Sequence, residues 1–456
     1  MPVWENNDAA INTIHEEMNS RLNDYDHQIL RIAVPSIVSN ITVPLLGLVD
    51  TAITGHLGAT AYIGAIAVGS MLFNVIYWLF AFLRMGTSGL TAQAYGQRDN
   101  DECRSLLKRS LTMAFTIGAA LIVLQLPVRQ LGLLIMGPTE EVRRLTTTYF
   151  GICIYGAPAM LGIFSLNGWF IGMQNARAPM VVAIAQNIVN IFVSLILVYG
   201  FGMKVEGVAT GTLVAQWAGF AMAAVLASRN IPTASSPSRQ RSARTSVSQS
   251  SLWRVNRDIF LRTLCLVSVL LFFTSAGSRQ GDVILAVNTL LMQLYLLVSY
   301  VMDGFANAAE AMSGKYWGAR DVLSFRRTVA HCFGWGTLCT ALFTLLYVVA
   351  GNNILQLLTD QQTVVTAAVD YLRWAWLVPV CCIGAFVWDG VFIGITASRQ
   401  MLCSSFLAAV VFFSIFFFCE DYLHNHALWL AFVAYMLTRG AVQTFLYNRI
   451  LKAGKT

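Results

Sequence analysis

The chain has 456 residues, of which 56% are apolar and 12% are charged, and its mean hydropathy is +0.61. Soluble proteins carry about 25% charged residues, so this composition excludes a soluble globular domain and indicates an all-α polytopic membrane protein. The formal net charge of +7 requires no nucleic-acid partner, because the basic residues fall in predicted loops. The nine cysteines form no CxxC pair and predict neither a metal centre nor a disulfide framework.

Taken in chain order, the apolar segments predict twelve transmembrane helices. Residues 1–27 are polar and acid-rich and lack the apolar core of a signal peptide, so they predict a cytoplasmic N-terminal tail. Lysines and arginines gather in the loops on the side of this tail, which predicts a plasma (inner) membrane protein with both termini cytoplasmic. The predicted spans are 28–56, 60–86, 104–127, 146–173, 178–201, 206–228, 258–277, 284–313, 327–350, 368–396, 400–419 and 427–449.

The first predicted span, which includes the stretch from Pro35 to Gly58, contains a single carboxylate, Asp50. An acid at the bilayer centre costs about 2.5–3.5 kcal/mol on insertion scales, so we expect Asp50 to face a bundle interior or a water-filled cavity. Pro44 cannot donate a hydrogen bond to the carbonyl of Asn40 and predicts a hinge in this helix. A bendable helix with a costly acid is typical of a proton or cation site. The alternative is a permanently protonated Asp50 that only bonds to a neighbour.

Three polar residues share one face of the fifth predicted helix. Asn187, Asn190 and Ser194 are spaced i, i+3 and i+7. Asp50 and Ser194 each precede the outer end of their spans by about six residues, roughly 9 Å, so we expect them to lie at matching depth, where they could meet. The alternative is that these polar groups only hold helices together within the membrane.

Residues 229–255 separate two predicted lobes. They are rich in Ser and Arg and show no apolar periodicity, which predicts a flexible cytoplasmic linker. Before the linker lies an N-lobe, residues 28–228, and after it a C-lobe, residues 256–456. Each lobe contains six of the twelve predicted helices.

The C-lobe carries its own acids. Asp303, Asn307 and Glu310 are spaced i, i+4 and i+7 on the eighth predicted helix, and Asp389 lies near the inner end of the tenth. Acids at two depths suit a cation-attracting vestibule or a proton relay. For Glu310 and Asp389 the alternative is helix capping, or pairing with a loop arginine at 320 or 399.

The two lobes repeat each other in sequence. YGQRD, ending at Asp99, corresponds to WGARD, ending at Asp321, and NGWFIG from Asn167 corresponds to DGVFIG from Asp389. Both pairs are 222 residues apart (321 − 99 and 389 − 167). Because each half has six spans, the copies enter the membrane in the same orientation. This parallel repeat predicts two pseudo-symmetric six-helix lobes with a substrate route between them.

Four motifs resemble the DinF branch of the MATE (multidrug and toxic compound extrusion) transporters. They are LVDTAITGHLG from Leu48, LRMGTSGLTAQAYGQRD from Leu83, NGWFIGMQNARAP from Asn167 and VMDGFANAAEAMSGKYWGARD from Val301. The resemblance implies a two-lobed antiporter that exports organic, often cationic, compounds against an inward flow of protons or sodium ions. The partners are then a small-molecule substrate and the lipid bilayer.

The resemblance also implies roles for single residues. The family acid that carries the coupling ion matches Asp50, and a family threonine on the sixth helix matches Thr212. On the fifth helix the family has an Asn followed four residues later by an Asp, whereas this chain has Asn190 and Ser194. A single carboxylate in the N-lobe argues against a two-carboxylate sodium site and favours protons, with sodium as the alternative.

The sequence therefore predicts a monomeric proton-coupled antiporter and no enzyme. It contains no P-loop, no HExxH and no cluster of His and Cys, so we expect neither cofactor nor metal. The alternative function is a flippase for lipid-linked precursors. Such a flippase should line its cavity with Arg or Lys to hold phosphates, and the deep charges predicted here are mainly Asp and Glu.

Overall fold

The structure, a computed structural model, describes residues 24–42, 44, 47, 49, 53, 54, 60–231 and 249–453, without the side chains of 249–251. In these ranges the regular elements are all helical, which confirms the all-α prediction. Residues 24–42 form the first helix. The following helices are α2 (Thr60–Leu79), α3 (Phe82–Gly96), α4 (Asn100–Val123), α5 (Gln125–Met136), α6 (Glu140–Cys153), α7 (Ala157–Gly172), α8 (Arg177–Leu195), α9 (Val205–Asn230), α10 (Gln249–Ser278), α11 (Asp282–Gly318), α12 (Val322–Leu358), α13 (Gln362–Gly394), α14 (Ser398–Leu423) and α15 (Asn425–Ala453).

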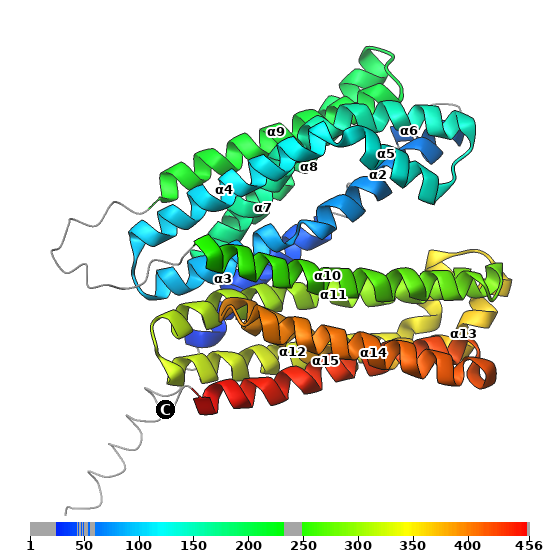
Figure 1. Ribbon diagram of the computed structural model, residues 1–456. Coiled ribbons are helices and arrows are strands. Elements are labelled where there is room, and N and C mark those ends of the chain that lie inside the picture. Colours follow the sequence, from blue (N-terminus) through cyan, green and yellow to red (C-terminus); the bar gives the residue numbers. More distant parts are fainter. Residues whose placement is uncertain are drawn as a thin grey trace, which may run out of the picture.

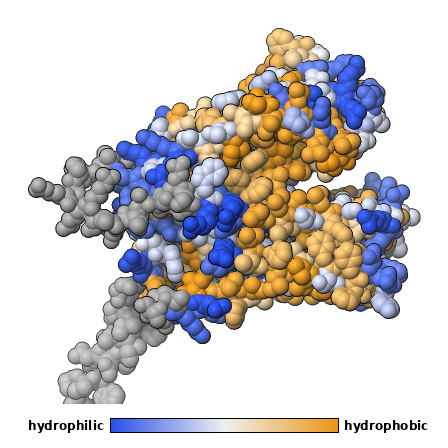
Figure 2. Space-filling view, viewed as in Figure 1, coloured by the Kyte–Doolittle hydropathy of each residue, from blue (hydrophilic) through white to orange (hydrophobic). Residues whose placement is uncertain are grey.

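Figure 1 shows two groups of helices, α2–α9 and α10–α15, which we call the N-terminal and C-terminal bundles. The bundles lie together at the end where α3 is labelled, which we call the joined end. They diverge toward the opposite, open end, near α5 and α6. Figure 2 shows apolar side chains over the middle of the molecule, polar ones at both ends, and a hollow between the bundles at the open end.

Ten helical stretches of the described chain are long and apolar enough to cross a membrane, beginning with Thr60–Gly96 and ending with Ser398–Leu423. They correspond to predicted spans two to eleven, with ends that differ mostly by a few residues. The first predicted span is described only in part, and the twelfth coincides with α15. The total of twelve spans therefore stays a prediction.

The structure corrects the predicted end of the N-terminal tail. The tail was expected to reach residue 27, but the first helix already includes residues 24–27. Side chains at its start are held by α12: the Tyr25 hydroxyl donates to Ser324 Oγ over 3.0 Å, and Trp335 Nε1 donates to Asp26 Oδ1 over 2.9 Å. The tail residues before 24 lie outside the described residues.

The predicted linker over 229–255 is wrong at both ends. Helix α9 continues through Asn230, and α10 already begins at Gln249, which leaves 232–248 outside the described residues. Leu252, Val255 and Ile259 are spaced i, i+3 and i+7 and are all buried, so an apolar helical face extends into the Ser- and Arg-rich segment. The loop expected before span four is also partly helical, since α5 occupies 125–136.

The sequence repeat is also a repeat of backbone conformation. Arg98 and Arg320 both have positive φ angles, 57° and 60°, and Gln174 and Thr396 have 63° and 56°. The members of each pair are 222 positions apart. These are the turns that end α3, α11, α7 and α13, so the two halves build the same turns from corresponding residues.

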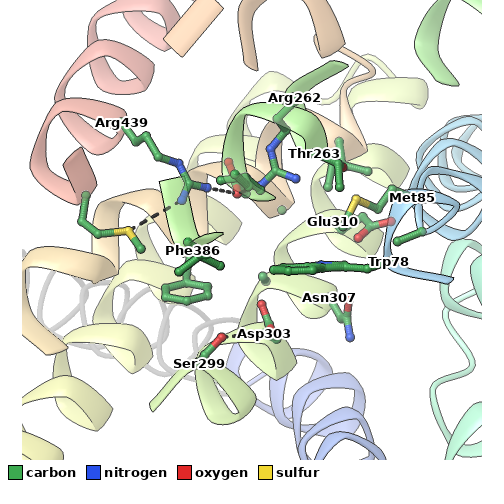
Figure 3. Close-up of a pocket in the computed structure, with 18 of the residues that line it drawn as sticks. Trp78, Met85, Arg262, Thr263, Ser299, Asp303, Asn307, Glu310, Phe386 and Arg439 are labelled. Carbon is green, nitrogen blue, oxygen red and sulfur yellow. Dashed lines mark hydrogen bonds and ion pairs between the residues drawn. The ribbon is translucent and has the colours of Figure 1, made fainter. Parts of the chain in front are cut away.

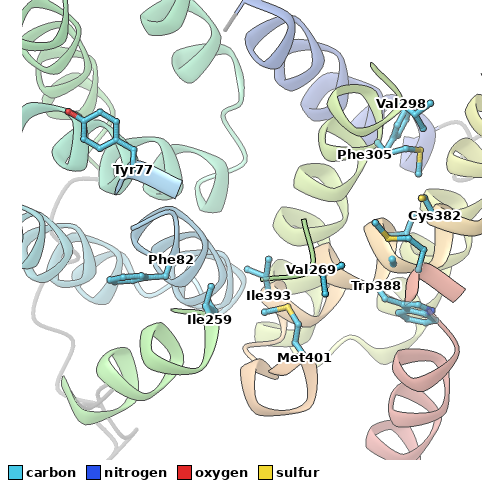
Figure 4. Close-up of a cluster of buried hydrophobic side chains, with 14 of the residues drawn as sticks. Tyr77, Phe82, Ile259, Val269, Val298, Phe305, Cys382, Trp388, Ile393 and Met401 are labelled. Atoms are coloured by element: carbon cyan, nitrogen blue, oxygen red, sulfur yellow. The ribbon is translucent and has the colours of Figure 1, made fainter. Parts of the chain in front are cut away.

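Helices α3 and α11 cross closely at the joined end because both carry glycine there. A Cβ atom on Gly96 would collide with the carbonyl oxygen of Lys315, and one on Gly318 would collide with that of Gln93. Each contact is the other one shifted by 222 residues in both partners, as in an interface between two equivalent units. Next to this crossing, Phe82 of α3 lies beside Ile259 of α10 (Figure 4), and its ring centroid is 6.0 Å from that of Phe260.

Candidate functional site

The polar residues predicted for the N-lobe site meet on α8 and α9. Asn190 Nδ2 donates to Thr212 Oγ1 over 3.1 Å, and Ser194 packs against Gly211, the neighbour of Thr212. Asn187 faces the first helix instead, because its Nδ2 donates to the Thr42 carbonyl over 2.9 Å. The structure thus joins the fifth and sixth predicted spans through Asn190 and Thr212, and the fifth and first through Asn187.

This cluster contains buried polar atoms with unused bonding capacity. Asn190 is 1% exposed and Ser194 is fully buried. Among the described residues, neither Asn190 Oδ1 nor Ser194 Oγ has a hydrogen-bond partner. Asp50, the acid predicted for this site, lies outside the described residues. Pro44 is described as an exposed helical residue, and its role as a hinge stays a prediction.

A second candidate site is a cavity of about 170 Å³ between the bundles (Figure 3). Trp78 at the end of α2 and Arg84 in α3 contribute from the N-terminal bundle. The remaining walls come from α10, α11, α13 and α15 of the C-terminal bundle. Helix α2 ends at Leu79 and α3 starts at Phe82, and this break lies at the cavity wall.

The predicted stripe of Asp303, Asn307 and Glu310 lines this cavity. Arg84 Nη1 donates to Asn307 Oδ1 over 2.9 Å and lies 3.5 Å from Glu310 Oε2, so it joins α3 to α11 across the two bundles. Asp303 accepts only a long hydrogen bond, 3.5 Å, from Ser299 Oγ within the described chain. Glu310 is therefore paired with a cation, whereas Asp303 is not. Arg320, the loop partner considered for Glu310, is not its partner here.

Asp389 lies deep in the same cavity and is also paired. Its Oδ2 atom accepts hydrogen bonds from Arg262 of α10 and, over 2.5 Å, from Arg439 of α15, while Gln443 donates to Oδ1 over 2.8 Å. The carboxylate is 8% exposed. The alternative of pairing with a loop arginine was thus right about pairing and wrong about the partner. Asp389 connects α10, α13 and α15 inside the C-terminal bundle.

Arg262 and Arg439 are the residues that the sequence reading missed. They lie in apolar segments at 4% and 5% exposure, which contradicts the expectation that the deep charges are mainly acidic. Among the described residues, three arginines (84, 262 and 439) and three acids (303, 310 and 389) line the cavity. The signal was available, because an arginine within an apolar span is as costly as an acid and marks an interior position.

Aromatic rings complete the cavity walls. Trp78 and Phe386 extend into it in Figure 3, and Tyr295, Phe432 and Tyr435 also line it. The Arg439 guanidinium lies over the Tyr435 ring, 5.5 Å from its centroid, in a cation–π contact. Within the described residues no group of three His, Cys, Asp or Glu side chains is arranged to hold a metal ion. The cavity therefore offers apolar surface and charges of both signs.

A helical membrane protein with a charged cavity between two bundles belongs to the structural class of transporters. The MatE family model matches residues 35–196 and 259–418, one stretch in each half of the chain. DNA damage-inducible protein F of Escherichia coli is 36% identical over 436 residues, which cover 95% of this chain and 94% of that protein. The chain belongs to the MATE family, in the branch of that protein.

More distant relatives and solved structures agree. A probable multidrug resistance protein NorM of Acinetobacter baylyi is 26% identical over 316 residues, which cover 66% of this chain and 67% of that protein. The crystal structure of MATE in complex with MaD3S superposes with a TM-score of 0.82 at 20% identity, covering 95% of this chain and 97% of that one. An outward-facing conformation of a MATE transporter gives the same TM-score and coverage. These likenesses show the fold.

Proposed function

We propose that this protein is a secondary active antiporter that exports organic, cationic or amphiphilic compounds in exchange for protons. The observation that carries the proposal is the charged cavity, whose walls come from both bundles. A tilt of one bundle against the other would open this cavity to one side of the membrane and then to the other, as alternating access requires. Membership of the MATE family supports export over other transport functions.

The proton carrier in this proposal is Asp50, the single ionisable residue of the N-lobe set that also includes Asn187, Asn190, Ser194 and Thr212. Two observations support it. Asn190 and Thr212 bond to each other between α8 and α9, and Asn190 Oδ1 and Ser194 Oγ are buried without partners in the described part of the chain. Buried polar atoms of this kind are suited to hydrogen bonds that form and break as a neighbouring carboxyl group gains or loses a proton.

The first helix connects this site to the cavity. Asn187 holds the Thr42 carbonyl, and two residues earlier in the same helix Asn40 Nδ2 donates to the Tyr300 carbonyl of α11 over 3.1 Å. One residue past Asp303, Gly304 packs so closely against Ala33 and Ile37 that no side chain would fit. A bend at Pro44 would therefore act on the part of α11 that carries Asp303.

The pairing of the acids supports protons over sodium as the coupling ion. A sodium site requires several oxygen ligands around one ion, and Asp303 with Glu310 was the candidate set in the C-lobe. Glu310 and Asp389 are occupied by Arg84 and by Arg262 with Arg439, which leaves Asp303 as the one cavity acid without a cationic partner among the described residues. One carboxylate binds sodium weakly but exchanges a proton readily.

The proposal extends to the whole chain as a monomer with twelve spans in two six-helix lobes, both termini in the cytoplasm and residence in the inner membrane. It has no enzymatic step and no cofactor. A flippase for lipid-linked precursors is the second candidate function. Arg262 and Arg439 favour it, because buried arginines can hold phosphates. The acids and aromatic rings of the same cavity favour small organic compounds.

Transport by purified protein in liposomes tests the coupling ion. Ethidium uptake would be followed with the membrane potential clamped, first under a pH gradient alone and then under a sodium gradient alone. We expect accumulation with the pH gradient and none with sodium at constant pH. A sodium requirement at constant pH would contradict proton coupling. Failure to move ethidium under either gradient, combined with translocation of a lipid pyrophosphate, would favour the flippase.

A further inference from the structure

Two cations of the cavity share a single acid. Arg262 and Arg439 both donate to Asp389 Oδ2, so this cluster of three ionised side chains has a net charge of +1. On the α3–α11 side of the cavity, Arg84 and Glu310 form a pair of zero net charge. Asp303 contributes one negative charge without a cationic partner in the described chain. The cavity thus keeps one uncompensated positive charge and one uncompensated negative charge.

The two arginines also have donors to spare. A guanidinium has five N–H donors. Among the described residues, Arg262 donates to Asp389 alone, and Arg439 donates to Asp389 and to the Met436 sulfur over 3.6 Å. The Nε atoms of both are buried without an acceptor. Unpaired buried donors are costly, so an anionic group that entered the cavity would be bound by atoms that now lack partners.

The uncompensated charges come from different helices. Arg262 and Arg439 project from α10 and α15, and Asp303 projects from α11 with only Ser299 beside it in Figure 3. Trp78 and Phe386 lie between these groups in the same view. A ligand that meets both charges must therefore carry its own two charges at opposite ends of an apolar, planar body.

We propose that the cavity binds compact aromatic zwitterions, with a carboxylate on the Arg262–Arg439 pair and a protonated amine at Asp303. This inference rests on the proposed function, because it names the substrate class of that exporter. A charge-assisted hydrogen bond to each end explains why the cavity retains two arginines on one acid. A plain organic cation would leave the arginine donors unpaired, and a plain anion would leave Asp303 unpaired.

Three compounds that share one scaffold test the proposal. They are para-aminomethylbenzoate, its methyl ester, which keeps only the positive charge, and its N-acetyl derivative, which keeps only the negative charge. Binding of each labelled compound to the purified full chain in detergent would be measured by equilibrium dialysis. We expect the zwitterion to bind about tenfold or more tightly than either derivative, since charge-assisted hydrogen bonds contribute more than neutral ones. Equal binding of the zwitterion and the ester would overturn the proposal.

Two substitutions then separate the two ends of the ligand. Arg262→Gln leaves Asp389 paired with Arg439 and Gln443, so the network stays charge-balanced. This variant should bind the zwitterion no better than the ester while its affinity for the ester is retained. Asp303→Asn should reduce zwitterion binding to the level of the N-acetyl derivative, whose affinity is retained. The retained affinities show that each variant is folded, and Arg439→Gln provides a second test of the arginine pair.

An equal loss of affinity for all three compounds in Arg262→Gln would assign the arginines to structure alone and overturn the proposal. The ethidium assay separates this failure from failure of the proposed function. If ethidium is exported under the pH gradient and the zwitterion shows no preference, only the substrate class is wrong. If no compound binds or is transported, both the substrate class and the exporter function are wrong.

Discussion

Asp99 and Asp321 occupy the same place in two turns that are 222 residues apart. Each follows an arginine with positive φ, and each caps the next helix, since Asp99 Oδ1 accepts from the Glu102 amide over 2.9 Å and Asp321 Oδ1 from the Ser324 amide over 3.0 Å. The acid therefore satisfies one of the free amides at the helix start. The shared RD dipeptide of the sequence repeat has a structural explanation that requires no role in transport.

At the scale of single residues, we predict that Asp321→Ala lowers the free energy of unfolding by about 1 kcal/mol, the usual cost of losing such a cap. Burial works to raise the pKa of Asp321, but hydrogen bonds from Ser324 and Leu323 outweigh it and lower the pKa below its ordinary value. A lowered pKa stabilises the folded state above the pKa of the unfolded chain, about 3.9, and this contribution is lost as the pH falls through the folded value.

The measurement is thermal unfolding of the purified protein in detergent between neutral pH and about pH 3.5. The difference between the parent and Asp321→Ala should shrink toward the acid end. Asp321→Asn is the matched control, because its amide oxygen still caps the helix and does not titrate. A difference that stays constant with pH would show that the carboxylate charge is not what stabilises this turn.

Single residues were also where sequence reasoning was least complete. The acidic stripe of α11 was predicted to share one face, and Asp303, Asn307 and Glu310 do line one cavity. Their partners were not predictable, because Arg84, Arg262 and Arg439 come from three other helices whose rotation about their axes no local pattern fixes. Periodicity gives the face of one helix but does not say which face of another helix it meets.

At the scale of helices, the close crossing of α3 and α11 holds the bundles together at the joined end. The crossing depends on Gly96 and Gly318, where the carbonyl oxygens of the opposite helix occupy the space of a side chain. In membrane bundles, where apolar surface gives no net drive for association, close backbone packing at small residues is a main source of stability. The same crossing lies next to the bond from Arg84 to Asn307.

We predict that Gly318→Val destabilises the protein by roughly 1–3 kcal/mol, the range for an overpacked interior site. Gly334→Val on α12 is the matched control, since no atom lies within 4 Å of the place where its Cβ would be. The thermal midpoint in detergent should fall for Gly318→Val and stay near the parent value for Gly334→Val. Equal midpoints for the two variants would mean that the crossing contributes nothing to stability.

Predicted and observed helices agree best where length alone decides. Predicted spans such as 178–201 and 206–228 match the helical stretches Arg177–Gly200 and Val205–Asn230 closely, because a bilayer requires about 20 apolar residues in succession. Helix α5 was missed because it is short and mostly exposed, with Leu133 as its one buried residue. The first turns of α10 were missed because three buried apolar residues are sparse among Ser and Arg.

At the scale of the whole molecule, the two halves share sequence, turns and a reciprocal contact, yet their charges differ. The N-terminal half has Asn167 where the C-terminal half has Asp389, and Ala81 where the other has Asp303. The proposal assigns a different task to each half: the N-lobe set around Asp50 carries the proton, and the cavity carries the substrate. The first helix contacts both through Asn187 and Tyr300.

The most direct test of this division is Asp50→Asn compared with Asp303→Asn in liposomes that hold purified protein. Two quantities are measured for each variant: ethidium accumulation driven by a pH gradient, and ethidium exchange at equal concentration without any gradient. We predict that Asp50→Asn loses accumulation and keeps exchange, because an amide fills the space of a carboxyl group but cannot carry a proton. Asp303→Asn should keep the response to the gradient. Gradient-driven accumulation by Asp50→Asn at the parent level would contradict proton coupling through Asp50.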